Sequence, residues 1–159
     1  MVKKKNTVRL KNEIDIHSKL DHPNIIKMYG NFEDDVSHYM ILELCEQGEL
    51  FTYLKSKGCL KDDEIALIGY QLAQALKYLH DKKILHRDLK LGNILIADDI
   101  TIKLCDFGLA VQLTDLSEER KTLCGTPNYI SPEILNMTPY SFKVDYWSFG
   151  CILYALATG

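Results

Sequence analysis

The sequence lacks the features that mark metal-binding, secreted and membrane proteins. None of its five cysteines belongs to a CxxC pair or has a histidine at zinc-site spacing, so we expect reduced thiols in an intracellular setting. The longest apolar run, 151–157, is far too short to span a bilayer. The lysines at 3–5 precede polar residues, which argues against a secretory signal and favours a solvated chain end over a nuclear address.

A strong excess of one charge is also absent. The formal net charge is −3 and the two signs are interspersed, which indicates neither a nucleic-acid nor a membrane partner. Of the 159 residues, 47% are apolar, which is enough for one buried core, while the length argues against two independent domains. The sequence contains no internal repeat or low-complexity linker. Its partner must therefore be inferred from local motifs.

Apolar spacing and turn residues predict an alternation of helices and short strands. The predicted elements are helices over 8–20, 50–55, 64–80 and 145–157, and strands over 25–30, 39–44, 93–96 and 101–105, with a polar turn at 33–35. The last two strands form a hairpin. The stretch 112–128 is irregular, and loops of this length are usually functional or disordered. The last helix is apolar nearly all round, which predicts burial in a core.

Four motifs follow one another in a fixed order. They are HRDLKLGN at 86–93, DFG at 106–108, SPE at 131–133 and DYWSFG at 145–150. In this order they match the catalytic loop, the metal-binding motif, a variant of the APE motif and the start of the central helix of protein kinases. The sequence most resembles the polo-like kinases, through HRDLKLGN, ERKTLCGTPNYI at 119–130 and SFKVD at 141–145. The Aurora group is the closest alternative.

The resemblance covers essentially the whole chain and implies an incomplete α+β, two-lobe protein-kinase fold. Residues 1–44 would be the remnant of the small β-rich lobe with its helix C, residues 45–48 the hinge, and residues 49–159 the large lobe up to its central helix F. The same resemblance implies ATP and Mg²⁺ as cofactors and Ser or Thr side chains of proteins as substrates.

Phosphoryl transfer needs an acceptor hydroxyl aligned with the terminal phosphate and positive charge around that phosphate. Asp88 is placed to orient the hydroxyl and, beside Arg87, is expected to be ionised. Asn93 and Asp106 supply oxygen ligands of the kind that Mg²⁺ binds. Lys90 would bring a mobile positive charge to the γ-phosphate, and by the family resemblance it implies Ser/Thr rather than Tyr substrates.

The resemblance also implies a nucleotide pocket. Glu13 stands where kinases place the glutamate that pairs with the lysine of strand three, but residues 1–12 contain neither a GxGxxG loop nor a β-rich run with that lysine. Taken alone, Glu13 is a solvated helix residue. Leu42 would be the gatekeeper, and the backbone of Glu43 to Cys45 would bind the adenine edge as the hinge. Glu49 would be a carboxylate on the ribose side or the substrate side, and Leu95 would form the pocket floor. From sequence alone Leu42 and Leu95 are interpreted as ordinary core.

Regulation is expected at Thr122. In polo-like kinases the threonine of the KTLCGTP run is the activation-loop phosphosite, and a phosphate there adds about −1.5 to −2 charge. Arg87 is expected to receive this phosphate and so to fix the loop and the base together. Thr126 is expected to bond to Asp88 and Lys90 and to shape the pocket for the residue that follows the phosphoacceptor.

His86 is interpreted as a structural residue rather than a catalyst. The resemblance implies that it belongs to a stacked column of His17, Met28, His86 and Phe107, which Asp145 anchors.

Two functions of different classes remain open. The first is a piece of a working polo-like Ser/Thr kinase in cell-division control, inside the cell in the cytoplasm, the nucleus or at the centrosome and spindle pole. The second is a non-catalytic pseudokinase that acts as a scaffold or decoy. The retained Asp88, Asn93 and Asp106 favour the first.

The isolated chain is expected to have little or no activity. Part of the apolar face of helix 145–157 would stay uncovered, which favours association.

Overall fold

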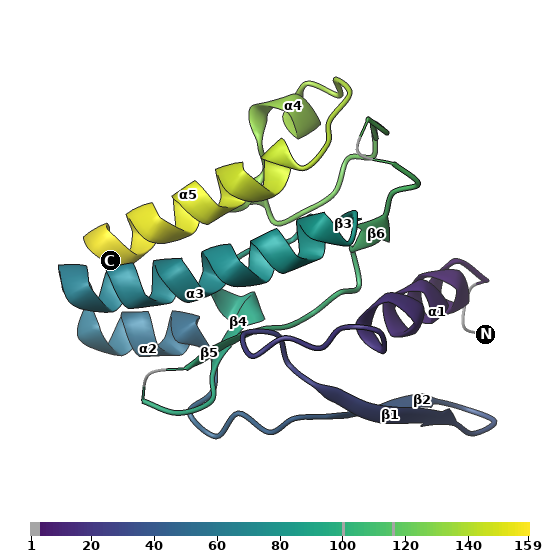
Figure 1. Ribbon diagram of the computed structural model, residues 1–159, viewed down its shortest axis with the longest axis horizontal. Helices are drawn as coiled ribbons and strands as arrows, with labels where there is room; N and C mark the ends of the chain where they lie inside the picture. The colour runs from purple at the N-terminus through teal and green to yellow at the C-terminus, as the bar shows by residue number, and fades with distance from the viewer. Residues whose placement is uncertain (1–3, 100, 116) are drawn as a thin grey trace.

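The computed structural model describes residues 4–99, 101–115 and 117–159, with side chains from Arg9 onward (Figure 1). The described helices are α1 (Lys4–His17), α2 (Leu50–Lys57), α3 (Asp62–Asp81), α4 (Pro132–Leu135) and α5 (Lys143–Thr158), with 3₁₀ turns η1 (Leu91–Asn93) and η2 (Pro127–Tyr129). The described strands are β1 (Met28–Glu33), β2 (His38–Leu42), β3 (Ile84–Leu85), β4 (Ile94–Ile96), β5 (Ile102–Leu104) and β6 (Val111–Gln112).

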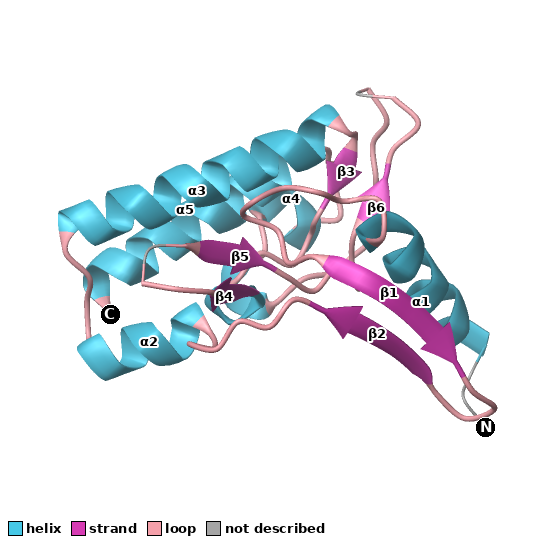
Figure 2. Ribbon diagram, turned by 60° about the horizontal axis from the view of Figure 1, so that its bottom comes forward, coloured by secondary structure: helices cyan, strands magenta, loops and turns pink. Residues whose placement is uncertain are grey.

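The elements form a large helical part and a smaller part that contains α1 and the β1–β2 ribbon. In Figure 1, α3 and α5 lie side by side, and α1 and the ribbon lie on the far side of α3 from α5. Figure 2 shows the β4–β5 hairpin between these two parts. The three sheets, β1–β2, β3–β6 and β4–β5, are two-stranded and antiparallel. This arrangement agrees with the incomplete α+β kinase fold that the sequence predicts, while the lobe limits at residues 44 and 48 stay a prediction.

Helix α3 forms the centre of the large part. Its first turn is acidic, which suits the positive end of a helix dipole. The Glu64 side chain also accepts a hydrogen bond from the backbone nitrogen of Lys61 at 3.1 Å, so the N-terminus is capped. One face then buries Leu72, Leu76 and Leu79 completely. The helix predicted over 64–80 is confirmed, with two additional residues at its start and one at its end.

Helix α1 begins earlier than predicted and ends earlier. It includes Lys4 and Lys5, which were expected in a solvated chain end, and it ends at His17 rather than at residue 20. The backbone nitrogen of Leu20 donates to the carbonyl of His17 at 3.0 Å, which closes a turn.

The first two strands are shifted from their predicted positions. The strand predicted over 25–30 begins only at Met28, because Ile25 and Ile26 pair with Leu104 of the hairpin instead. It then continues to Glu33, which was predicted in the turn. The partner strand ends at Leu42, two residues before its predicted end. The other predicted strands and helices are found within a few residues of their expected ends.

Helix α5 is not buried all round, and this prediction is wrong for the described chain. Its buried residues are Val144, Asp145, Ser148, Ile152 and Leu156. Tyr146, Trp147 and Tyr154 are exposed, Tyr154 by 73%. The reason is that α3 covers one face, while the opposite face lines a depression of about 560 Å³ together with Asn128 and Tyr129. The expected uncovered apolar face of this helix is therefore present.

A second, smaller core lies beside the main one. It joins β3, the segment after β6 and the starts of α4 and α5 through Leu85, Leu113, Ile134, Tyr140 and Val144. The stretch predicted as irregular is thus anchored at its start, where β6 pairs with β3. Within the described ranges, no helix is long and apolar enough to cross a membrane. The five cysteines are free thiols.

Candidate active site

The start of the catalytic loop, 86–93, is anchored by hydrogen bonds to one buried carboxylate, that of Asp145. Asp145, only 1% exposed at the start of α5, accepts hydrogen bonds from the backbone nitrogens of His86 at 3.0 Å and Arg87 at 2.9 Å. His80 Nε2, at the end of α3, lies 2.9 Å from the same carboxylate. Burial alone would raise the pKa of Asp145, but the bond to His80 and the other favourable contacts lower the pKa below its usual value. The carboxylate therefore stays charged and holds the loop.

Two residues of the site, Arg87 and Asp106, have a left-handed backbone conformation that is energetically costly for residues other than glycine. Arg87 has a φ of 67° and Asp106 a φ of 63°, in the left-handed region that favours glycine. Such conformations persist only where surrounding contacts impose them. For Arg87 this contact is the hydrogen bond from its backbone nitrogen to Asp145. For Asp106 it is the hydrogen bond that Asp106 Oδ1 accepts from the Gly108 backbone nitrogen at 3.2 Å.

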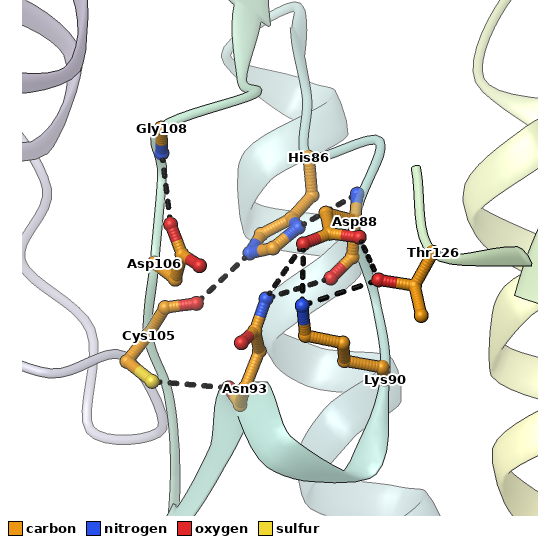
Figure 3. Close-up of polar contacts among 8 residues, drawn as sticks. All are labelled: His86, Asp88, Lys90, Asn93, Cys105, Asp106, Gly108 and Thr126. Carbon is orange, nitrogen blue, oxygen red and sulfur yellow. Dashed lines mark hydrogen bonds and ion pairs between the residues drawn. The ribbon is translucent and has the colours of Figure 1, made fainter. Parts of the chain in front are cut away.

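The Asp88 side chain is bonded to three residues, Lys90, Thr126 and Asn93. It is 8% exposed, and its Oδ2 lies 2.9 Å from Lys90 Nζ. Thr126 Oγ1 donates to Asp88 Oδ1 at 2.7 Å and accepts from Lys90 Nζ at 3.1 Å (Figure 3). The two bonds expected for Thr126 are therefore present. They connect the catalytic loop to a segment that lies 38 residues further along the chain.

Asn93 and Asp106 face the same space as Asp88. The Asn93 amide nitrogen donates to the Asp88 carbonyl oxygen at 2.9 Å and to its Oδ2 at 3.2 Å, which leaves the amide oxygen on the opposite side. Figure 3 shows this oxygen and the Asp106 carboxylate on the same side of Asp88. That the three side chains form one functional site, and the role of each, stay predictions.

The oxygen donors present fit a divalent cation that shares its shell with phosphate. Mg²⁺ is usually bound through one or two carboxylates plus phosphate oxygens and water, rather than by a cage of protein side chains. Asn93 and Asp106 supply one amide oxygen and one carboxylate. Over the ranges that the structure describes, no group of three His, Cys, Asp or Glu residues could hold a metal by itself.

His86 connects Asp88 to the segment before Asp106. It is fully buried, its Nε2 lies 3.1 Å from the Cys105 carbonyl oxygen, and its Nδ1 accepts from the Asp88 backbone nitrogen at 3.3 Å. These partners require a neutral ring with the proton on Nε2. Burial lowers the pKa of His86, which agrees with that form. A neutral, buried histidine with both nitrogens occupied is a structural residue, as the sequence analysis proposed.

The predicted column is formed around Phe107. Its ring centroid lies 4.8 Å from that of His17 and 5.1 Å from that of His86. His17 is buried, and its Nε2 lies 2.8 Å from the Ile26 carbonyl oxygen. Met28 is buried as well, but its place in the column stays a prediction. The column ties α1 to the catalytic loop through side chains of three segments.

Glu13 lies beside Asp106. A Cβ placed on Gly108 would be 3.2 Å from Glu13 Oε2 and from Asp106 Oδ1. Burial and the Asp106 charge raise the pKa of Glu13, while Arg9, one turn earlier on α1, opposes this rise. In the described chain, the cation that acts on Glu13 is therefore an arginine of its own helix.

Two residues of α1 bind the segment after Asp106, and the sequence analysis missed both. Arg9 Nε donates to the Gly108 carbonyl oxygen at 2.7 Å, and Asn12 Nδ2 donates to the Ala110 carbonyl oxygen at 3.0 Å. Their position one turn before Glu13 or directly beside it was the one hint that they lie near the site. Nothing in the sequence indicated their partners, Gly108 and Ala110, which lie 99 and 98 residues further along the chain.

The predicted adenine-site residues differ in their surroundings. Leu42 is 36% exposed, so its interpretation as ordinary core is wrong for the described chain, while Leu95 is half-buried. The Glu43 carboxylate is bound by Lys103 Nζ at 2.8 Å and by the backbone nitrogen of Lys27 at 3.1 Å. Burial would raise the pKa of Glu43, but the bonds from Lys103 and Lys27 lower it. Its side chain is thus engaged with β5.

Two further residues complete the predicted adenine site. Cys45 is half-buried, and burial raises the pKa of its thiol. Glu49 pairs through its backbone with Leu95, and its carboxylate lies 3.6 Å from a Cβ placed on Gly92. The structure thus brings Glu49 next to the catalytic loop. Whether these residues contact a nucleotide stays a prediction.

The predicted regulatory residues are connected through a residue that the sequence analysis missed. Thr122 is exposed, as a phosphosite must be. Arg87 Nε donates to the Leu109 carbonyl oxygen at 2.8 Å, and its Nη1 donates to the Tyr140 hydroxyl at 3.2 Å. The Tyr140 hydroxyl in turn donates to the Thr122 carbonyl oxygen at 2.9 Å. Arg87 thus reaches the Thr122 backbone through a buried tyrosine.

A family model described as "Protein kinase domain" matches residues 1–159, and the chain belongs to this family. Serine/threonine-protein kinase polo of Drosophila melanogaster is 45% identical over 159 residues, which cover 100% of this chain and 28% of the relative.

Two further relatives carry related names. Serine/threonine-protein kinase PLK4 of Nematostella vectensis is 47% identical over 152 residues, covering 95% of this chain and 16% of the relative. Cell cycle serine/threonine-protein kinase CDC5/MSD2 of Saccharomyces cerevisiae is 45% identical over 157 residues, covering 98% of this chain and 22% of the relative. The predicted resemblance to polo-like Ser/Thr kinases is confirmed. The chain spans between 16% and 28% of the length of these three relatives.

Proposed function

We propose that the protein that carries this chain transfers the γ-phosphate of ATP to Ser and Thr hydroxyl groups of proteins, in cell-cycle control. The observation that carries the proposal is the Asp88 carboxylate, which Lys90, Thr126 and Asn93 hold by hydrogen bonds on a loop anchored from α5. Members of the protein kinase family use ATP with a divalent metal and act on proteins, which supports the same reading.

Asp88 would orient the acceptor hydroxyl and take its proton. An ionised carboxylate has about four lone-pair sites. Asp88 Oδ1 accepts from Thr126 and Oδ2 from Lys90 and Asn93, so capacity remains for one more donor. The fixed carboxylate needs no reorganisation when a hydroxyl binds, which is the condition for efficient positioning. Lys90, held between Asp88 and Thr126, would add positive charge on the phosphate side.

Mg²⁺ is the metal that we propose for Asn93 and Asp106. Both donors are oxygen atoms, which favours a hard cation over zinc or copper. The bound ion would neutralise charge on the phosphate oxygens. Asn93 also binds Asp88 through its nitrogen, so the same side chain would fix the distance between metal and base. We further propose that backbone groups of 43–45, with Leu42 and Leu95, bind the adenine ring, and that Glu49 lies on the ribose or substrate side.

The experiment that tests this function uses the complete gene product. Radiolabelled ATP and a protein substrate are incubated with it, with and without EDTA, and the labelled amino acids are identified after hydrolysis. We expect label on Ser and Thr that disappears with EDTA. Label on Tyr alone, or no transfer under conditions where a polo-like kinase is active, would contradict the proposal.

The non-catalytic alternative is a scaffold that need not hold a triphosphate. Equilibrium binding of a fluorescent ATP analogue to the complete gene product separates the two functions, because a scaffold of this kind would show no Mg²⁺-dependent affinity.

The isolated 159-residue chain is expected to have very little kinase activity. Its sequence contains neither a GxGxxG loop nor a strand lysine, and these are the contacts that position a triphosphate in the family. Phosphate transfer to a peptide would be measured for the isolated chain and for the complete gene product at equal concentration. Comparable rates in the two would refute this expectation.

Thr122→Ala in the complete gene product is expected to lower activity on the order of ten-fold, because the phosphate that Arg87 would bind can no longer form. The measurement is the initial rate after pre-incubation with ATP. Thr52→Ala, an exposed threonine of α2, serves as the matched control. Equal rates for wild type and Thr122→Ala would show that Thr122 is not the regulatory site.

The remaining parts of the proposal concern partners and location. We propose that the exposed face of α5, with Tyr146, Trp147 and Tyr154, is covered by association, since exposed apolar patches of this kind are usually contact surfaces. We propose a location inside the cell, in the cytoplasm, the nucleus or at the centrosome and spindle pole. Neither a nucleic acid nor a membrane is proposed as a partner.

A further inference from the structure

Tyr140 lies between α4 and α5 and is buried to 3% exposure. Its ring packs in the second core with Leu85, Leu113 and Val144, so its position is fixed by apolar contacts. In Figure 1 the connection from α4 to α5 lies near the segment that follows β6. A buried tyrosine normally requires a partner for its hydroxyl. Here the hydroxyl has three partners, on two different segments.

The hydroxyl joins the catalytic loop to the activation segment. It accepts a hydrogen bond from Arg87 Nη1 at 3.2 Å and donates one to the Thr122 carbonyl oxygen at 2.9 Å. Cys124 Sγ lies 3.8 Å from the same oxygen. Burial raises the pKa of Tyr140, while Arg87 opposes the rise, so the phenol keeps the proton that it donates to Thr122.

The backbone of Tyr140 reinforces this connection. Its nitrogen donates to the Arg120 carbonyl oxygen and its carbonyl oxygen accepts from the Arg120 nitrogen, both at 2.9 Å. These two bonds form an isolated antiparallel bridge that holds the chain two residues before Thr122. Thr122 is therefore fixed on its N-terminal side by the Arg120 bridge and at its own carbonyl by the phenol.

We infer that Tyr140 is a positioning residue that couples the Thr122 segment to the guanidinium of Arg87 and so prepares Arg87 to bind a phosphate on Thr122. The inference rests on the proposed regulatory role of Thr122. With Nε held by Leu109 and Nη1 held by Tyr140, the planar guanidinium has a fixed orientation. A phosphate then binds a pre-arranged partner and loses less freedom on ordering the segment.

The test variant is Tyr140→Phe, which keeps the buried ring and removes only the hydroxyl. Tyr70→Phe, an exposed tyrosine on α3, is the matched control. Hydrogen exchange of the complete gene product is followed in peptides that cover residues 118–124. We expect exchange to be several-fold faster in Tyr140→Phe than in the wild type and the control. Unchanged exchange would overturn the inference, whether or not the protein is an active kinase.

The second readout separates positioning from a merely structural role. Kinase activity is compared for Tyr140→Phe in the wild-type background and in the Thr122→Ala background. We expect kcat to fall about five-fold in the first, with the KM for ATP little changed, and by less than two-fold in the second, because effects within one network do not add. An equal loss in both backgrounds would assign Tyr140 to general stability and contradict the inference.

Arg87→Lys is the further variant that keeps the test decisive if Tyr140→Phe is less stable. Lysine retains the charge but cannot form the fork of donors that binds Leu109 and Tyr140 together. The exchange difference caused by Tyr140→Phe in residues 118–124 should then be smaller in the Arg87→Lys background. A difference of the same size would show that the phenol does not act through Arg87. If wild-type protein transfers no phosphate, the proposed function fails while this exchange measurement still decides the connection.

Discussion

Asp88→Asn is expected to lower kcat of the complete gene product about a thousand-fold, within the range usual for loss of a proton-accepting group. Asparagine has nearly the same shape, but it carries no charge and is a poor proton acceptor. Its amide nitrogen would also have to face a donor, because Thr126 donates to one Asp88 oxygen and Lys90 and Asn93 to the other. The variant should therefore lose chemistry and local order at the catalytic loop together.

The measurement combines steady-state kinetics with equilibrium binding of ATP. We expect binding to change far less than kcat, because the proposed metal ligands Asn93 and Asp106 are retained. Asp81→Asn is the matched control, since Asp81 forms an exposed ion pair with Lys77 within α3. A kcat for Asp88→Asn within a factor of two of that of the control would rule out Asp88 as the base.

Asp145→Asn is expected to destabilise the fold by about 3 kcal/mol, the scale of leaving buried donors without acceptors. Oδ1 accepts from the Arg87 nitrogen and Oδ2 accepts from the His86 nitrogen, with His80 at the same oxygen. Whichever way the amide turns, its NH₂ group meets a buried donor. The left-handed conformation of Arg87 would lose its support, so activity should fall as well.

The stability that Asp145 contributes depends on pH in a definite direction. The pKa of Asp145 is lowered in the folded protein from its ordinary value of 3.8. A carboxyl group of this kind contributes stability above its unfolded pKa, and the contribution is lost as pH falls through the folded pKa. The stability difference between wild type and Asp145→Asn should therefore shrink as the pH falls below the ordinary Asp pKa of 3.8.

Urea unfolding of the complete gene product at several pH values provides the measurement. Asp35→Asn, in the exposed turn after β1, is the control and should behave like the wild type. A difference between wild type and Asp145→Asn that grows as the pH falls below the ordinary Asp pKa of 3.8 would mean that Asp145 does not hold the loop as a charged group.

The local parts of the site could be predicted because they lie close together in the chain. Asp88, Lys90 and Asn93 span six residues, so their mutual contacts follow from a single loop. Asp106 follows a hairpin whose two strands the sequence indicates by composition. The bonds of Thr126 to Asp88 and Lys90 were predicted through the family resemblance rather than from spacing. In each case, the pattern identified the residue and the structure supplied the distance.

The residues that the sequence did not reveal contact segments that are distant in the chain. Arg9, Asn12 and Tyr140 act through contacts with segments that their own sequence surroundings do not identify. An arginine, an asparagine and a tyrosine at these places are ordinary surface or core residues until the partner carbonyl oxygens are brought near. Leu42 was misplaced for the same reason, since an apolar strand residue is buried only where another segment covers it.

The sequence by itself identified the family and predicted the residues for its chemistry, a carboxylate base, a nearby lysine and two oxygen ligands, because the catalytic loop is a continuous stretch whose spacing limits its contacts. The tertiary structure alone decided what holds that loop in place. Asp145 lies 59 residues beyond His86, and His80, at the end of α3, meets the same carboxylate. Hydrogen bonds between such distant segments exist only after the helices have packed.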